Sequence, residues 1–271
     1  MNEQTGEIIK EVSKEIAKDV YDDTGKPVLK PTGEIVGLIP RTIKAALLPL
    51  EKWIVGREYN LKETQRLLEE KLKNVRLEDI ETPEAYIAVP ALQSISYCMD
   101  SEELRNMYAN LLANSMNKAV KNEVHPGFVE IIKQLSPDEA KIIKGIYFKQ
   151  LIPIITVRYE NDKSEGVDIF KNFSSIAEET NCEEIMDTNK YFDNLVRLGL
   201  LEKAGEYKTL VDKKLYETLK NNPNIKKLGM IPLNYQNQGY TKCKFEESYI
   251  EMTPYGNAFC ETCVVEKIKL K

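Results

Sequence analysis

The spacing of apolar residues changes once along this chain, close to Ser136. Before that point apolar residues recur every three or four positions, which is the pattern of amphipathic helices packed on a shared core. After it, β-branched runs such as 151–157 appear between helical segments. The four residues that start at Ser136, Ser-Pro-Asp-Glu, combine a helix cap, a first-turn proline and a capping-box glutamate. The sequence therefore predicts a helical domain over 1–135 and a second domain over 136–271.

The first domain is expected to contain several amphipathic helices. They are predicted over 6–20, over 35–55, and after Asn60, Pro83 and Asp100. Segment 35–55 is the most apolar part of the chain, but charged residues interrupt it, so it is not expected to span a membrane. Pro49 should kink or divide this helix. We favour a buried, kinked core helix, with a helix lying on a membrane surface as the alternative.

The second domain is predicted to run helix, strand, helix, helix, strand. After the helix at Ser136, these elements are expected over 151–157, 174–180, 186–198 and 200–203, followed by a partner strand over 248–252 and a last helix after Pro254. This order is typical of a winged helix-turn-helix, with 205–247 as an insertion at the wing. The predicted fold class is mainly α, with an N-terminal helical domain and an α+β winged-helix-like C-terminal domain.

The residue types exclude several kinds of chemistry. The chain has one histidine, His125, so a site that needs two imidazoles is ruled out. No phosphate-binding glycine loop and no Gly-x-Ser-x-Gly elbow occurs. Consecutive pairs such as Glu178 and Glu179 point apart on a helix and do not form an acid–base pair alone. We expect no catalytic residues, no cofactor and no enzymatic activity.

The cysteines are few and unevenly placed. Cys260 and Cys263 have the spacing of metal ligands, but a second such pair is missing, so no metal site is assigned and two buried core thiols are the favoured interpretation. Five cysteines, an odd number, and a charged N-terminal segment without a secretory pattern indicate a reducing compartment. We expect the protein to be cytoplasmic.

Two sets of polar residues are candidates for an interaction surface. Four asparagines recur at helical spacing among apolar residues, and asparagine is a poor helix former; they are Asn106, Asn110, Asn114 and Asn117. Solvated positions or a hydrogen-bonded seam between helices are the alternative interpretations. In the second half, the helix over 186–198 carries Lys190 and Arg197, but acids on the same helix offset them. Phosphate neutralisation drives nucleic-acid affinity, so DNA binding is not favoured.

The insertion over 205–247 is more basic and contains several tyrosines, a combination that serves single-stranded nucleic acid in some proteins. A solvated helix with core tyrosines is the more common arrangement. The formal net charge of −5 gives no reason to expect a general polyanion binder.

Several ordered blocks resemble the abortive infection alpha (Abi-alpha) family. The blocks are GEIVGLIPRTIKAALLPLEKWIV at 33–55, YNLKETQRLLEEKLKNV at 59–75, TPEAYIAVPALQSISY at 82–97, ELRNMYANLLANSMN at 103–117 and VHPGFVEIIKQLSPDEAKII at 124–143. This resemblance implies a role in antiphage defence, in which an infected bacterial cell stops growing or dies before progeny emerge. It supplies no catalytic motif. The expected partner is a phage or host protein; a nucleic acid, a membrane surface and a second copy of the chain remain alternatives.

Overall fold

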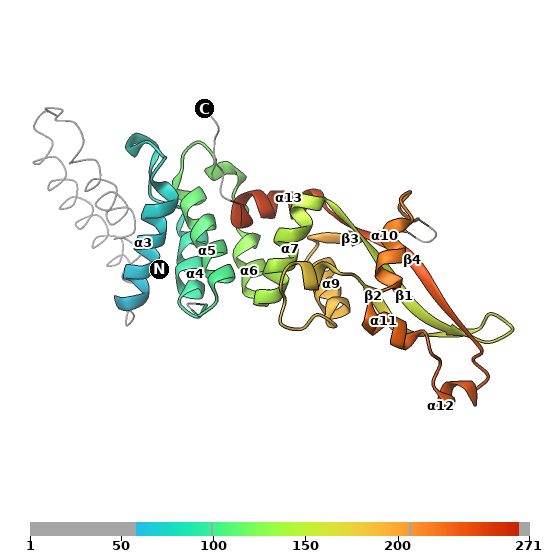
Figure 1. Ribbon diagram of the computed structural model, residues 1–271. Helices are drawn as coiled ribbons and strands as arrows, with labels where there is room; N and C mark the ends of the chain where they lie inside the picture. Colours follow the sequence, from blue (N-terminus) through green and yellow to red (C-terminus); the bar gives the residue numbers. More distant parts are fainter. Residues whose placement is uncertain (1–57, 99, 206–207, 266–271) are drawn as a thin grey trace, which may run out of the picture. The chain divides into compact units, whose positions relative to one another are not determined.

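The computed structural model describes residues 58–98, 100–205 and 208–265 (Figure 1). The helices predicted over 6–20 and 35–55, and with them the alternative of a membrane-surface helix, lie outside the described residues. The chain divides into two compact units, 1–130 and 131–271, which are described separately. Among the described residues, no helix combines the length and the apolarity that a bilayer crossing requires.

Unit 1 is built around one central helix. Its helices are α3 (Glu58–Leu72), α4 (Ala85–Ile95) and α5 (Glu102–Met116), with short 3-10 turns at Leu77–Asp79 and Lys121–Glu123 and with α6 (Gly127–Lys133) at the unit boundary. Helix α5 begins where the side chain of Ser101 accepts a hydrogen bond from the N–H of Leu104, and it packs against both α3 and α4. Its apolar residues, including Tyr108 and Leu111, form the core of the unit.

Unit 2 contains a four-stranded antiparallel sheet in the order β2-β1-β4-β3. The strands are β1 (Leu151–Glu160), β2 (Gly166–Phe173), β3 (Leu201–Lys203) and β4 (Lys242–Met252). Strand β1 pairs with β4 over its whole length, from Leu151 opposite Glu251 to Glu160 opposite Lys242. The pair β1–β4 is therefore the longest part of the sheet. Strand β3 pairs through only three residues, at the C-terminal end of β4.

Helices cover the sheet of unit 2. They are α7 (Pro137–Lys149), α8 (Ile176–Glu179), α9 (Thr188–Arg197), α10 (Lys214–Lys220), α11 (Pro223–Leu228), α12 (Leu233–Gln236), α13 (Pro254–Phe259) and a π-helical turn at Cys260–Val264. The predicted capping box at Ser136 is confirmed, with reciprocal hydrogen bonds to Glu139. Gly199 ends α9 with φ at +74°, as its sequence position indicated.

The two faces of β1 lie in different surroundings. Ile155, Val157 and Tyr159 point to one face, where they form a core with side chains of β2, α10 and α11. On the opposite face, the outer part of β1 presents Arg158, whose guanidinium donates to the carboxylate of Asp168 on β2 at 2.6 Å. The sheet is thus apolar on the face covered by α10 and α11. Its other face is charged around Arg158 and Asp168.

The fold class predicted from the sequence is wrong in its second half, because unit 2 is a four-stranded antiparallel α+β unit and not a winged helix. Strand β2 occupies residues that the sequence pattern left unassigned, since Asp168, Lys171 and Asn172 interrupt its apolar positions. The predicted short strand over 248–252 is the C-terminal part of the eleven-residue β4. The chain is also not mainly α, because β1 pairs with a strand on each side along most of its length.

Candidate functional site

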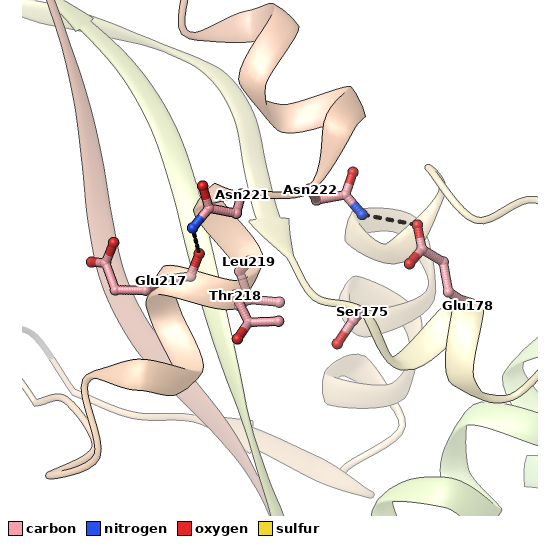
Figure 2. A pocket seen from close by; sticks show the side chains of 7 residues that line it. All are labelled: Ser175, Glu178, Glu217, Thr218, Leu219, Asn221 and Asn222. Atoms are coloured by element: carbon pink, nitrogen blue, oxygen red, sulfur yellow. Dashed lines mark hydrogen bonds between the residues drawn. The ribbon is translucent and has the colours of Figure 1, made fainter.

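A pocket lies in unit 2 between α8 and the connection from α10 to α11 (Figure 2). Its volume is about 500 Å³. The lining residues are Ser175, Glu178, Glu217, Thr218, Leu219, Asn221 and Asn222. Leu219 is buried and belongs to the core beneath. The other six lining residues are polar, although apolar atoms supply the larger share of the exposed lining.

Local hydrogen bonds hold the walls of this pocket. The side-chain N–H of Asn222 donates to the carboxylate of Glu178 at 2.9 Å, which links α11 to α8. The side-chain oxygen of Asn222 also accepts from the N–H of Asn224 and caps α11, with Pro223 in its first turn. The side chain of Asn221 donates to the backbone carbonyl of Glu217 at 2.8 Å. Both asparagines are therefore fixed in position at the pocket edge.

A cluster of charges lies beside the pocket on α10 and β4. The ammonium of Lys220 contacts the carboxylates of Glu217 at 2.8 Å and of Glu247 at 2.9 Å, and Lys213 contacts Glu247 at 2.7 Å. Hydrogen bonding to Glu217, outweighing partial burial, raises the pKa of Lys220, with a further contribution from Glu247. Burial acts to raise the pKa of Glu247, but the two lysines outweigh it and the pKa is lowered. Both shifts favour the charged forms of Lys220 and Glu247, which pair with each other.

The two carboxylates of the pocket do not converge. Figure 2 shows the carboxyl groups of Glu178 and Glu217 at opposite ends of the pocket, with that of Glu178 directed toward Asn222. The carboxylate of Glu217 accepts from Lys220. Across the described ranges, no three His, Cys, Asp or Glu side chains gather so that they could hold a metal ion. The pocket offers two fixed amides, two hydroxyls and two separated carboxylates, which is a set of groups for hydrogen bonding to a ligand.

Two buried carboxylates at the start of α7 connect this helix to α9. The carboxylate of Asp138 accepts from the hydroxyl of Tyr191 at 2.9 Å and from the backbone N–H of Glu183 at 3.0 Å. Glu139 accepts from the side-chain N–H of Asn194 at 2.8 Å. Burial acts to raise the pKa of Asp138, but hydrogen bonds from Lys141, Tyr191 and two backbone N–H groups lower it. Burial, and next the hydrogen bond to Asp138, raise the pKa of Tyr191. The hydrogen bonds of these two acids join α7 to α9 and to the turn before it.

The asparagines predicted as an interaction row all lie at α5. Asn110 is buried at 5% exposure, whereas Asn106 and Asn114 are half-buried. Asn117 ends the helix, and its side-chain oxygen accepts from the N–H of Ala119 at 3.0 Å. The helix therefore brings these residues together on one element, with Asn110 facing the interior of unit 1.

The two predicted basic residues lie on α9, in unit 2, and both are exposed. Lys190 pairs with Asp187 at 2.7 Å, one turn earlier on the same chain segment. The guanidinium of Arg197 donates to the side-chain oxygens of Asn194 at 2.6 Å and of Gln134 at 3.0 Å. Each is already engaged by a neighbour within its unit.

The remaining residues singled out from the sequence have structural surroundings. Cys260 and Cys263 are both buried in the π-helical turn, and burial raises the pKa of each thiol. None of the five cysteines forms a disulfide. The ring nitrogen Nδ1 of His125 accepts from the N–H of Gly127 at 3.0 Å, just before α6. Glu179 contacts Lys149 and Ser175 whereas Glu178 contacts Asn222, so the two consecutive acids do point apart.

Sequence reasoning missed the pocket itself. The Asn-Asn-Pro run at 221–223 is a recognisable helix start, and it marks one wall. Nothing local, however, joins it to Ser175 and Glu178 more than forty residues earlier. Their proximity depends on the hairpin formed by β1 and β2, and the sequence pattern did not reveal β2.

Comparison with known proteins gives one family. A family model described as "Abortive infection alpha" matches residues 56–263. No curated protein matches the chain. A solved structure described as that of an uncharacterized protein from the hydrocarbon-degrading marine bacterium Alcanivorax borkumensis SK2 is similar over 55% of this chain and 96% of that chain, with 13% identity and a TM-score of 0.36.

Proposed function

We propose, from the premise that this chain belongs to the abortive infection alpha family, that it is a cytoplasmic antiphage defence protein that binds a protein partner and catalyses no reaction. Membership of the family makes it an abortive-infection-type protein. What the chain does within that response follows from its own surfaces. The absence of disulfides among its five cysteines is compatible with a reducing compartment.

The observation that carries the proposal is the arrangement of the pocket. Acid–base catalysis by two carboxylates requires both to reach the same substrate. Here Glu178 is hydrogen-bonded to Asn222 at one end, and Glu217 is paired with Lys220 at the other. This separation supports a binding role for the pocket and gives no support to a paired-acid mechanism.

The pocket suits a side chain or loop of a protein partner. Fixed polar groups surround a small volume over a buried leucine, Leu219, which is the arrangement that holds an anchor residue at many protein interfaces. Thr218 is exposed on α10 at the edge of the pocket. Among the described contacts, its hydroxyl makes one hydrogen bond, to the backbone carbonyl of Lys214 at 3.1 Å.

Filling the pocket tests this function. Thr218→Arg places a long side chain in the space that a partner would occupy, without changing a buried residue. We expect cells that carry this variant to lose phage protection, measured as efficiency of plating against cells that carry the unchanged protein. Val211→Arg is the matched control, because Val211 is 99% exposed and lies outside the pocket.

Equal protection by Thr218→Arg and the unchanged protein would show that the pocket is not the contact surface. Loss of protection by both variants would point to a general effect of added charge and would equally contradict the proposal. Circular dichroism melting curves of both variants establish that each remains folded.

A further inference from the structure

The exposed apolar residues of unit 2 include a pair at its distal end. Met230 and Leu233 are 72% and 74% exposed, and they flank the turn between α11 and α12. Figure 1 shows α12 at the distal end of the long strands β1 and β4. We call residues 226–236 the distal tip.

The distal tip is held firmly in place, so the exposure of these side chains is fixed by the fold. Ile225 is buried, and Leu228, Ile231 and Tyr235 pack against the same core on the sheet. The hydroxyl of Tyr159 on β1 donates to the backbone carbonyl of Leu228 at 2.6 Å. The side chain of Gln236 closes the turn by donating to the carbonyl of Ile231 at 2.7 Å. With one set of side chains anchored inward, the intervening residues must face solvent.

The charge of the distal tip is of one sign. No Asp or Glu occurs between Thr218 and Phe245, although acidic residues outnumber basic ones in the chain. The lysines of β4 in this stretch, Lys242 and Lys244, contact Asp162 and Glu160 of the adjoining hairpin. Lys226 and Lys227 are exposed, and no acid in the described part of the chain pairs with either. Within eight residues, 226–233, the tip thus contains two exposed lysines without an acidic partner in the described part of the chain and two exposed apolar side chains.

We propose that the distal tip docks on an anionic lipid surface, with Met230 and Leu233 entering the acyl boundary and Lys226 and Lys227 contacting acidic headgroups. Lipid surfaces bind such combinations because a short apolar insertion and a basic patch are each weak alone and act together. This inference is independent of the pocket and adds a membrane partner to a protein proposed to bind another protein.

The arrangement fits lipid better than single-stranded nucleic acid. Nucleic acid requires exposed aromatic faces on which bases stack. The tyrosines of this segment are turned inward, since Tyr235 packs edge-on against Tyr159 with ring centroids 5.2 Å apart, and Tyr240 lies 6.1 Å from Tyr235. What the tip exposes is aliphatic, and aliphatic groups gain from entering a hydrocarbon region.

Co-sedimentation of the full chain with vesicles tests the proposal. We expect binding to vesicles that contain 40% phosphatidylglycerol in phosphatidylcholine, little binding to phosphatidylcholine alone, and weaker binding as KCl rises, because salt screens the lysines. Lys226→Gln with Lys227→Gln should weaken partition about twenty-five-fold, since each lysine near an acidic surface contributes about five-fold. Met230→Ser with Leu233→Ser should weaken it by about ten-fold or more.

Matched controls alter the same residue types elsewhere in unit 2. Lys208→Gln with Lys214→Gln removes two exposed lysines, and Val211→Ser removes an exposed aliphatic side chain. These variants should bind vesicles as the unchanged chain does.

Several outcomes would overturn the inference. Failure of the unchanged chain to bind anionic vesicles would do so, as would equal binding by the tip variants, because the lipid contact would then lie elsewhere in the chain. Equal loss in the control variants would mean that charge in general, and not the tip, drives binding. A gel shift with single-stranded DNA or RNA that is abolished by the Lys226 and Lys227 changes, without vesicle binding, would assign the tip to nucleic acid instead.

Discussion

Unit 1 and the α7–α9 junction of unit 2 solve the same problem, the joining of helices, with different groups. In unit 1, α5 contacts its neighbours mainly through fully buried apolar side chains such as Leu111 and Tyr108. At the start of α7, the carboxylates of Asp138 and Glu139 hold α9 and the turn before it by hydrogen bonds. The first arrangement depends on filled volume, and the second depends on charges with complete sets of partners.

This difference predicts different weaknesses. A packed apolar core loses stability when atoms are removed, and it is insensitive to protonation. A junction made by buried carboxylates tolerates changes in nearby volume but fails when the charge is removed, because several donors lose their acceptor together. The following predictions separate the two, and hydrogen exchange followed by mass spectrometry reports each unit through its own peptides.

The largest effect is expected in the core of unit 1. Leu111→Ala removes a side chain with no exposed surface from the centre of α5 and should cost about 2–5 kcal/mol, from lost burial and the cavity that remains. Urea unfolding measures the loss. Tyr97→Ala is the control, because Tyr97 is 77% exposed, and its cost should stay within about 0.5 kcal/mol. A loss below about 1 kcal/mol for Leu111→Ala would mean that the helices of unit 1 close up around the missing atoms.

The next effect is expected at the α7–α9 junction. Asp138→Asn preserves the size of the side chain but removes its charge, and one of its two acceptor oxygens becomes a donor. In one orientation this donor faces the hydroxyl of Tyr191 and the N–H of Glu183, and in the other it faces the ammonium of Lys141. The cost should be about 2–3 kcal/mol, with increased exchange in peptides of α9. Asp162→Asn, at an exposed ion pair with Lys242, should cost little. If the two variants unfold alike, the junction is held by packing and not by the carboxylate.

Acid should distinguish the two regions without any substitution. In unit 2 the pKa values of Asp138 and Glu247 are lowered below their ordinary values of 3.8 and 4.5. A carboxylate whose pKa is lower when folded stabilises the protein above its unfolded pKa, and this contribution is lost as pH falls through the folded value. The lowered carboxyl pKa in unit 1, that of Glu63, comes first from a hydrogen bond with the exposed Arg66, and such pairs contribute little. We therefore expect unit 2 to lose protection from exchange as pH falls from 4.5 to below 3.8, before the core around Leu111 does. Simultaneous loss in both units would contradict this.

The sequence predicted those elements whose signals are local. The capping box at Ser136, the glycine that ends α9 and the spacing of α5 are all contained in short segments, and each is confirmed. Strand β2 was missed because its residues are half-buried and partly polar, so that pairing with β1 stabilises it and not its own composition. The winged-helix assignment failed for the same reason. The predicted order of elements omitted β2, because only its pairing with β1 identifies this segment as a strand.

The candidate site was harder to predict than the fold. At the pocket, Asn222 donates a hydrogen bond to Glu178, which lies on a distant segment of the chain. At the distal tip, Met230 and Leu233 are exposed, whereas Tyr235 packs against the core. The basic character of 205–247 was visible in the sequence, but which lysines are neutralised was not, because Glu247 lies on a different element from Lys213 and Lys220. Surface function depended on contacts between segments that no periodicity records.

The smallest effect is expected at Arg197, which borders the junction from outside. Its guanidinium contacts Asn194 and Gln134, and Asn194 in turn donates to Glu139, so a chain of hydrogen bonds leads from the surface to a buried acid. The contacts of Arg197 itself are exposed, and such contacts contribute less than about 1 kcal/mol. Arg197→Ala should therefore change urea unfolding by less than that amount, with Lys190→Ala as the control, since Lys190 contacts only Asp187 among the described ion pairs. A loss clearly above 1 kcal/mol for Arg197→Ala alone would show that the surface arginine positions Asn194 against Glu139 and belongs to the junction. If both variants lose little stability, they can be compared in phage-plating assays. Reduced phage protection by such a stable variant would then indicate that the substituted residue contacts a partner.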